Sequence, residues 1–285
     1  MYAAFYKLDE MPFRLTPDPQ FFYESRIHGR ALAYLKYGLH KSEGVVVVTG
    51  DVGTGKTILV DRLLSQLDRA RFAVSEVATT QLEPEELLGM IAAGFGLAGG
   101  GLAKAALLGG LAETLSGLRL NGKRPLIIVD EAQNLPFRSI EELRMLTNLK
   151  CDHGPLVQTV MVGQTPFRQL LARPDFEQLA QRVVAICHLQ SLGAEETRRY
   201  IEHRLRRVGW AGDPAVDDDA FHAVFRHTNG VARRINMLFD RVLLLGFLEA
   251  MHKVGGDLVE QVAAEMKEEG IPPPPSTIVR EAERR

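Results

Sequence analysis

Cysteine is scarce in this sequence, which has 285 residues and two cysteines, Cys151 and Cys187. The two form no CxxC pair and stand in no Cys/His cluster with the spacing of metal ligands, so we expect no zinc site. Two lone thiols fit a reducing compartment, and we therefore expect a cytoplasmic protein.

Long hydrophobic runs are missing too. A spanning helix needs ~20 apolar residues, and the nearest approach, residues 89–103, is shorter, rich in glycine and followed by Lys104. We interpret this stretch as a buried helix and a flexible glycine turn, and we expect no membrane span. The opening MYAAFYKLDEMPF carries acid early and has no continuous apolar stretch, so it does not resemble a signal peptide.

Neither sign of charge is in clear excess. The sequence has 34 Lys and Arg and 36 Asp and Glu, which gives a net charge of −2. This balance gives no global electrostatic reason to expect nucleic acid, although it leaves room for a local basic patch. The hydrophobic fraction of 46% and the charged fraction of 25% are ordinary for a globular protein. The length suits one large domain or two modest ones.

What the sequence does contain is an alternation of short apolar runs and helical patterns. Five runs are typical of buried strands: residues 45–49, 72–78, 126–130, 156–163 and 183–189. Helical patterns follow the first four, at residues 58–67, 83–95, 139–150 and 165–182. This alternation predicts a parallel α/β sheet with helices on both faces.

The composition changes near residue 190. Beyond it the strand signals stop, and we expect four amphipathic helices at residues 194–209, 217–228, 231–252 and 255–268. The sequence therefore predicts an α/β domain over 44–190 and a helical domain over 191–270. Residues 1–43, an aromatic and proline-rich segment with a helix from about 28 to 40, are expected to join the α/β domain. The Pro-rich residues 271–285 are expected to be disordered.

Residues 50–57, GDVGTGKT, match the motif GxxxxGK[ST] in full, between a strand and a helix. A chance glycine turn would leave this full match, in the expected strand–loop–helix context, unexplained. The glycines of such a loop let backbone N–H groups wrap phosphates, and the helix N-terminus adds partial positive charge. Lys56 is expected to reach the β- and γ-phosphates and Thr57 to bind Mg²⁺. The expected ATP contacts are Gly50, Asp51, Val52, Gly53, Thr54, Gly55, Lys56, Thr57 and Ile58.

Two further strands end in polar side chains. LIIVDE at 126–131 ends in two acids, and a carboxylate at the carboxyl end of a strand lies at the edge where the P-loop begins. We expect Asp130 to hold Mg²⁺ and Glu131 to act as general base, although a strand can also simply run into solvent. VMVGQ at 160–164 places Gln164 near the γ-phosphate or the lytic water, unless it is only a turn residue.

Three arginines stand at informative positions. Arg182 begins the last strand, where it could be a solvated helix end, a structural ion pair or a finger that reaches a neighbour's γ-phosphate, with Arg173 as substitute. NGVARRIN at 229–236 puts two arginines at a helix start, where cations oppose the helix dipole. That position indicates an anionic partner. We expect Arg233 to contact ATP, or else to be one more surface arginine, and Arg234 to contact a nearby acid.

In this order the pieces resemble the AAA+ ATPases: Walker A at 50–57, Walker B at 126–131, sensor 1 at Gln164, an arginine finger at Arg182 and a sensor 2 arginine, Arg233, in a helical lid. More narrowly, residues 1–270 resemble the general secretion pathway A (ExeA-like) ATPases, and among them the secretion ATPase encoded with exosortase and PEP-CTERM or exopolysaccharide loci. The segments that carry this resemblance are FYKLDEMPFRLTPDPQFFYES, HGRALAYLKYGL, VTGDVGTGKT, VDEAQNL, LRMLTNL and VMVGQ.

The resemblance implies strand order 5-1-4-3-2, ATP between the sheet and the lid, and a homo-oligomer in which Arg182 acts in trans. The N-terminal aromatics would wall the adenine or only cap the core. Ala232 replaces the proline of the usual sensor 2 motif, and Thr79 stands where related proteins often have an asparagine that tethers the catalytic glutamate. Longer secretion ATPases continue into a membrane helix and a peptidoglycan-binding domain, so direct cell-wall binding is not implied here.

Two functions compete. The first is a cytoplasmic ATPase that uses Mg·ATP to drive conformational change in an envelope assembly, exopolysaccharide or protein export system, peripheral to the inner membrane through its partners. The second is a DNA-binding ATPase like the transposition regulators TniB and MuB. Its phosphate contacts would come from one helix, with Arg198, Arg199, Arg204, Arg206 and Arg207. The acidic balance and the glutamates of that helix favour the first, and the intact Glu131 disfavours a scaffold without turnover.

Overall fold

The computed structural model describes residues 1–16, 18–78, 81–98, 103–151 and 154–270. Their contacts divide them into two compact units. The sheet unit contains Arg26–Val52 and Leu59–Leu189. The helical unit contains Met1–Ser25, Gly53–Ile58 and the described residues from Gln190 onwards.

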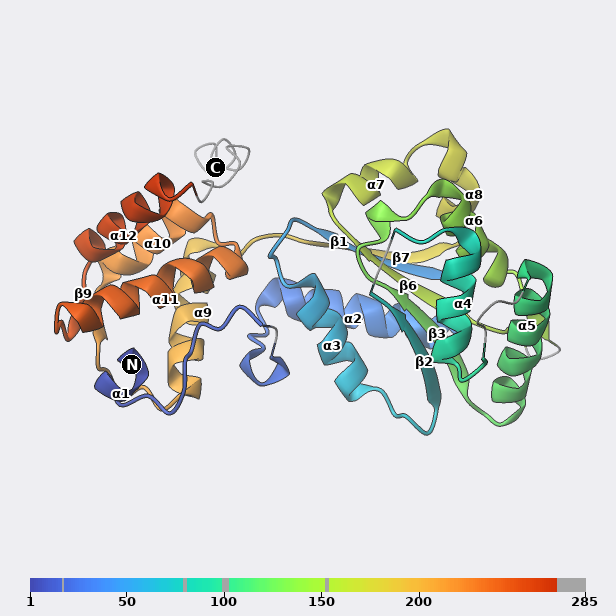
Figure 1. The fold of residues 1–285 in the computed structure, drawn as a ribbon, viewed down its shortest axis with the longest axis horizontal. Helices are drawn as coiled ribbons and strands as arrows, with labels where there is room; N and C mark the ends of the chain where they lie inside the picture. The colour runs from blue at the N-terminus through green and yellow to red at the C-terminus, as the bar shows by residue number, and fades with distance from the viewer. Residues whose placement is uncertain (17, 79–80, 99–102, 152–153, 271–285) are drawn as a thin grey trace. The chain divides into compact units, whose positions relative to one another are not determined.

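Five parallel strands form the centre of the sheet unit (Figure 1). They are β1 (Val45–Gly50), β2 (Phe72–Val77), β3 (Arg124–Val129), β6 (Gln158–Gly163) and β7 (Val183–Leu189). Their spatial order is β2-β3-β6-β1-β7. When these five strands are numbered 1 to 5 along the chain, the order read from β7 to β2 is 5-1-4-3-2. The predicted topology is confirmed.

The strand register decides where the functional side chains lie. Val48 of β1 pairs with Val162 of β6, and Met161 of β6 pairs with Val129 of β3. Because these pairs are parallel, the carboxyl ends of β1, β6 and β3 lie side by side at one edge of the sheet. We call this edge, with the residues that directly follow the three strands, the carboxyl edge.

Helices cover both faces of the sheet. The side chains of β1 point alternately to the two faces and are therefore buried on both. Val45 and Val47 pack into the core formed with α4, α5 and α6, whereas a Cβ on Gly38 of α2 would touch Val46 on the other face. The bounds of the helices are α2 (Arg26–Lys41), α3 (Lys56–Gln66), α4 (Pro84–Gly94), α5 (Lys104–Leu120), α6 (Phe137–Leu146), α7 (Thr165–Leu171) and α8 (Glu177–Ala180). A run of β-branched residues buried on both faces is typical of a central parallel strand.

Two helical predictions differ from the structure. The sequence indicated one helix between β2 and β3, but α5 is a second one, and its interior glycines lower the helix propensity that would have revealed it. The single helix predicted over 165–182 is interrupted by a 3₁₀ turn at Pro174–Phe176, because proline lacks the N–H that a continuous helix needs. A short antiparallel pair, β4 (Lys150–Cys151) and β5 (Gly154–Pro155), precedes β6.

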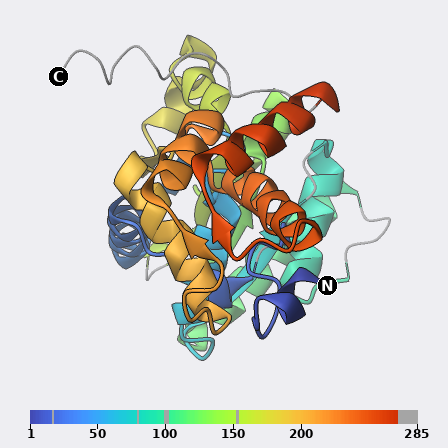
Figure 2. The same ribbon diagram turned by 90° about the vertical axis from the view of Figure 1, so that its left-hand side faces the viewer.

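The helical unit contains the four helices that the sequence predicts, shown in Figure 2. They are α9 (Ala194–Arg207), α10 (Asp218–Thr228), α11 (Ala232–Leu248) and α12 (Gly256–Glu268). The strands β8 (Ala215–Val216) and β9 (Lys253–Val254) pair in parallel. With two residues each, they are too short to be predicted from hydrophobic periodicity. No helix among the described residues is long and apolar enough to cross a membrane. Residues 271–285 and Thr79 lie outside the described part.

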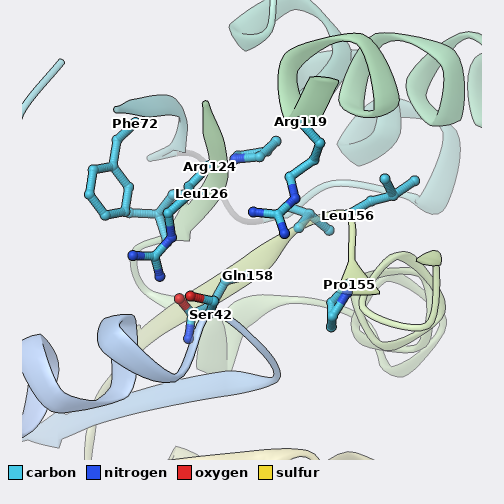
Figure 3. A pocket seen from close by; sticks show the side chains of 10 residues that line it. Ser42, Phe72, Arg119, Arg124, Leu126, Pro155, Leu156 and Gln158 are labelled. Atoms are coloured by element: carbon cyan, nitrogen blue, oxygen red, sulfur yellow. The ribbon is translucent and has the colours of Figure 1, made fainter. Parts of the chain in front are cut away.

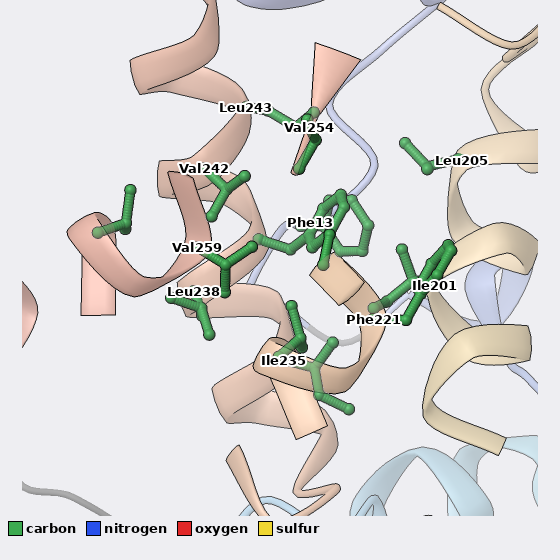
Figure 4. Packing of buried hydrophobic residues seen from close by; sticks show 14 of the residues in the cluster. Phe13, Ile201, Leu205, Phe221, Ile235, Leu238, Val242, Leu243, Val254 and Val259 are labelled. Carbon is green, nitrogen blue, oxygen red and sulfur yellow. The ribbon is translucent and has the colours of Figure 1, made fainter. Parts of the chain in front are cut away.

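Four of the N-terminal aromatics lie in the hydrophobic core of the helical unit: Tyr2, Tyr6, Phe13 and Phe21. Figure 4 shows Phe13 in this core. Phe13 is 1% exposed, and its ring centroid lies 5.0 Å from that of Phe239 on α11. Short helix α1 (Tyr2–Phe5) packs on α11, and the 3₁₀ turn Pro19–Phe21 packs on α9. By its contacts the N-terminal segment therefore divides: residues 1–25 group with the helices and 26–43 with the sheet. These buried rings act as core residues, the second of the two interpretations.

The core position of Phe13 gives a stability prediction. Phe13→Ala leaves a cavity in the helical unit and should lower its free energy of unfolding by about 3–5 kcal/mol. Met11→Ala, which truncates a side chain that is 42% exposed in the same segment, should change it by less than about 0.5 kcal/mol. Urea unfolding followed by tryptophan fluorescence measures both. Equal midpoints for the two variants would contradict the packing described here.

Candidate nucleotide site

The P-loop, residues 50–57, starts at the last residue of β1 and ends in the first turn of α3. Gly53 and Gly55 have φ angles of +82° and +93°, a region that glycine enters at little cost. Backbone N–H groups in loops of this kind form concave sites for anions. The two glycines therefore take backbone angles that other residues seldom adopt.

Lys56 places a cation at the start of α3. Its side chain is buried, with 6% exposed, and the first turn of α3 contains no acidic residue. A positive charge at a helix N-terminus opposes the helix dipole, so an anion bound there would relieve an unfavourable arrangement. These features fit the phosphates of a nucleotide.

The start of α11 contacts the P-loop within the helical unit. The Arg233 N–H donates to the Gly53 carbonyl at 3.2 Å, and a Cβ added to Gly53 would lie 2.8 Å from the Arg233 Cβ. The predicted sensor 2 residue thus adjoins the loop expected to hold phosphate. Arg234 makes no ion pair among the described residues, and burial lowers its pKa, so the acid expected beside it is not seen there.

At the carboxyl edge, the structure brings together Glu131 and Gln164, two of the expected site residues. The Gln164 side-chain amide donates to Glu131 Oε2 at 3.0 Å. A third residue, Gln133, donates to the same oxygen at 2.6 Å and accepts the Gln164 backbone N–H on its own Oε1 at 2.8 Å. Gln133 was not among the site residues expected from the sequence, although it lies in the segment VDEAQNL, which carries part of the family resemblance.

Glu131 itself has an unusual backbone conformation. Its φ and ψ are 52° and 36°, in the left-handed region that non-glycine residues seldom occupy. Its N–H donates to the Asp130 carboxylate at 2.8 Å, and its carbonyl accepts the Asn134 N–H at 3.0 Å. Strained conformations of this kind persist where neighbouring groups hold them and are concentrated at functional sites.

The P-loop is tied to the same edge by a hydrogen bond. The Thr165 hydroxyl donates to the Asp51 carboxylate at 2.6 Å. Asp51 directly follows β1, and Thr165 directly follows Gln164 at the end of β6. Together with the Gln164–Glu131 bond, this contact joins the ends of three neighbouring strands.

A second carboxylate lies near Asp130. Burial, and then the charge of Asp130, raise the pKa of Asp61 on α3. Asp61 stands one helical turn after Thr57, on the same face of the helix. Two neighbouring carboxylates repel one another, and hard oxygen ligands of this type suit Mg²⁺. The Asp130 carboxylate and the Thr57 hydroxyl are ligands of this type, so they fit the magnesium that the motifs imply. Asp61, which the sequence alone did not indicate, is a further carboxylate that is affected by the charge of Asp130.

Arg182 lies far from these residues. It directly precedes β7, and its carbonyl accepts the Val45 N–H at 2.9 Å, at the amino end of β1. The six residues of β1 span roughly 20 Å at ~3.3 Å per residue, which exceeds the reach of an arginine side chain. The Arg182 side chain is exposed. Arg173, the substitute, pairs with Asp175 at 2.8 Å.

A small pocket lies at the amino end of the sheet, away from the P-loop (Figure 3). Two of its lining residues hold the end of α2: Arg124 donates to the Leu39 carbonyl and covers the Phe72 ring at 4.8 Å, and Gln158 donates to the Gly38 carbonyl at 2.7 Å. Burial, and then the charges of neighbouring arginines, lower the pKa of Arg124. These contacts satisfy carbonyls at a helix C-terminus, so they give the pocket a structural explanation.

Comparison with known proteins agrees with the fold described above. Residues 39–171 match the family model described as AAA domain. The chain has the P-loop AAA fold. It is related to general secretion pathway protein A of Aeromonas hydrophila, with 38% identity over 260 residues that cover 90% of this chain and 47% of that protein. The chain thus spans about half the length of this relative.

Solved structures with this fold are more distant in sequence. The ORC2 protein of Aeropyrum pernix has a TM-score of 0.66 at 17% identity, covering 88% of this chain and 72% of that one. CDC6P of Pyrobaculum aerophilum has a TM-score of 0.67 at 17% identity, covering 92% and 70%. The RuvB Holliday junction branch migration motor of Thermotoga maritima has a TM-score of 0.54 at 17% identity, covering 85% and 68%. At such identities the likeness is one of fold.

The contact between Gly53 and Arg233 gives a binding prediction. Gly53→Ala adds a methyl group 2.8 Å from the Arg233 Cβ and should weaken binding of a fluorescent ATP analogue at least ~10-fold, because the P-loop must shift. Gly96→Ala is the matched control, since Gly96 has a similar φ of +85° but no atom within 4 Å of an added Cβ. It should bind as the wild type does. Unchanged affinity in both variants would contradict the proposed use of this loop.

Proposed function

We propose that this protein is an AAA+ ATPase that binds Mg·ATP with residues 50–58 and hydrolyses it with Glu131 as general base. The observation that carries the proposal is the hydrogen-bonded carboxyl edge, where Thr165 bonds to Asp51 at 2.6 Å and Gln164 bonds to Glu131 at 3.0 Å. These contacts join the start of the phosphate loop, the base and the sensor residue. Hydrolysis needs those three elements to be held in fixed geometry.

The roles of the binding residues follow from their chemistry. Lys56 would neutralise the β- and γ-phosphates, and the Thr57 hydroxyl and the Asp130 carboxylate would hold Mg²⁺, with Asp61 nearby. Mg²⁺, when bound, neutralises charge on the phosphate oxygens. Arg233, at the start of α11 beside Gly53, would contact the phosphates from the helical unit.

Glu131 would activate the attacking water. Both amides at this edge bond Oε2, and we assign Oε1 to accept the proton of the water. Gln164 would orient the water or the γ-phosphate, because its amide lies directly beside the base.

The relationship to general secretion pathway protein A supports a role in the cell envelope. We propose that ATP turnover drives conformational change in an envelope assembly, exopolysaccharide or protein export system, and more narrowly one encoded with an exosortase and PEP-CTERM substrates. The protein would then act from the cytoplasm, peripheral to the inner membrane through its partners. Proteins that co-purify with an ATP-trapped Glu131→Gln variant would test this, and recovery of transposition proteins in place of envelope proteins would argue against it.

The arginines of α9 do not favour the transposition-regulator alternative. Three of them make ion pairs: Arg198 with Glu202 at 3.0 Å, Arg199 with Glu195 at 3.1 Å and Arg206 with Glu202 at 2.8 Å. Arg204 is 5% exposed and donates to the Pro12 carbonyl, and Arg207 donates to the Gln20 carbonyl at 2.9 Å. All five have internal partners, so we do not propose a DNA-binding function.

Two variants test the proposed chemistry. Lys56→Ala should abolish tight ATP binding, because the β- and γ-phosphates lose their fixed cation. Glu131→Gln should keep binding and lose ~10²–10⁴ of the turnover, the usual contribution of a general base. Nucleotide affinity and phosphate release on each variant measure the two effects. Wild-type turnover in Glu131→Gln would remove that residue from the mechanism.

We further propose that the active form is a homo-oligomer in which Arg182 serves a neighbouring subunit. This is supported by the position of Arg182 at the amino end of the sheet, too far from Glu131 of its own chain. A finger neutralises charge that develops on the γ-phosphoryl group and contributes ~10³–10⁵ in rate. Arg182→Ala should therefore bind ATP and hydrolyse it very slowly.

Mixing two inactive variants tests the trans arrangement. An Arg182→Ala subunit keeps its base, and a Glu131→Gln subunit keeps its arginine, so mixed assemblies should contain some complete sites and regain activity. Phosphate release should appear on mixing and depend on the ratio of the two proteins. A mixture as inactive as its components would mean that Arg182 does not act across an interface. Arg173→Ala is the control and should retain activity.

A further inference from the structure

Gln133 occupies a position with two different hydrogen-bond requirements. Its Nε2 faces the Glu131 carboxylate at 2.6 Å, and its Oε1 faces the Gln164 backbone N–H at 2.8 Å. A carboxylate only accepts hydrogen bonds and a backbone N–H only donates them. The amide therefore fits one way round, because a flipped amide would put oxygen against the carboxylate and N–H against N–H.

The surroundings of Gln133 leave little room for other arrangements. The side chain is half-buried in the 3₁₀ turn Ala132–Asn134, directly after the strained Glu131 backbone. Its Oε1 would lie only 3.1 Å from a Cβ at Gly163, the last residue of β6. The amide is thus seated against the end of β6 while it bonds the residue that ends β3.

We propose that Gln133 is a positioning residue for hydrolysis, which couples the carboxylate of Glu131 to the sensor segment at the end of β6. The inference rests on the proposed function and deepens it. Gln133 fixes the rotamer of Glu131 by bonding Oε2, and it fixes the Gln164 backbone. A displacement of the β6 end on nucleotide binding therefore reaches the base through the Gln133 amide, in addition to the direct bond from the Gln164 side chain. In this proposal Gln133 acts through Glu131 and Gln164 and is assigned no contact with the nucleotide or the reacting atoms.

The test separates turnover from binding. Gln133→Met keeps the length of the side chain and removes both hydrogen bonds, one of them to a charged group. It should lower kcat about 10-fold or more and leave KM for ATP and the affinity for a fluorescent ATP analogue within about twofold. Gln133→Glu, which cannot donate when ionised and repels Glu131, should lower kcat further than Gln133→Met.

A matched control removes the same type of contact elsewhere. The Gln261 amide donates to Glu265 at 3.2 Å on the exposed face of α12, and Gln261→Met should hydrolyse ATP at the wild-type rate. Thermal unfolding of all variants checks that each is folded. If kcat is unchanged in Gln133→Met, or if KM rises in proportion to the loss, the positioning role is overturned.

A double-mutant cycle decides whether Gln133 acts through Glu131. Single-turnover hydrolysis of γ-labelled ATP should show that Gln133→Met slows the wild-type background but causes no further loss in Glu131→Gln. An equal loss in both backgrounds would mean that Gln133 acts by another route and would overturn the inference, while leaving the proposed function intact. Absence of turnover in the wild-type protein would overturn the proposed function, and the inference with it.

Discussion

Glu131 places a negative charge where a buried strand ends, and two amides hold it there. Gln133 and Gln164 both donate to Oε2, at 2.6 and 3.0 Å, and the Asp130 carboxylate accepts the Glu131 N–H at 2.8 Å. A left-handed conformation costs a non-glycine residue roughly 1–2 kcal/mol, which these bonds offset. These bonds set the direction of the carboxylate.

This arrangement depends on the sheet. The strand order places β6 between β1 and β3, so the residues after β6 can bond to residues after either neighbour. Gln164 uses one side for Glu131, and Thr165 uses the other for Asp51. With another strand order the same motifs would follow strands that are not neighbours in the sheet. The topology is therefore what brings phosphate loop, base and sensor within hydrogen-bond reach.

The sequence predicts the parts of the molecule whose physics is local or periodic. Strands with β-branched runs, amphipathic helices and the P-loop can each be predicted from a short stretch of sequence. The strand order 5-1-4-3-2 was expected from the family resemblance. Long-range contacts are different. Gln133 accepts the N–H of Gln164, which follows β6, and the charge of Asp130 helps to raise the pKa of Asp61. Residues 1–25 group with helices that begin near residue 194. Nothing in a window around these residues carries that information. The helix α5 was missed for a local reason, since its glycines resemble a loop.

The central claim is that this carboxyl edge hydrolyses ATP with a bound magnesium ion. The most direct measurement is phosphate release by the purified wild-type protein with ATP, once with Mg²⁺ and once with EDTA. We expect phosphate release with Mg²⁺ and none with EDTA, because Thr57 and Asp130 are assigned to the metal. Release that is absent with Mg²⁺, or equal in both, would contradict it.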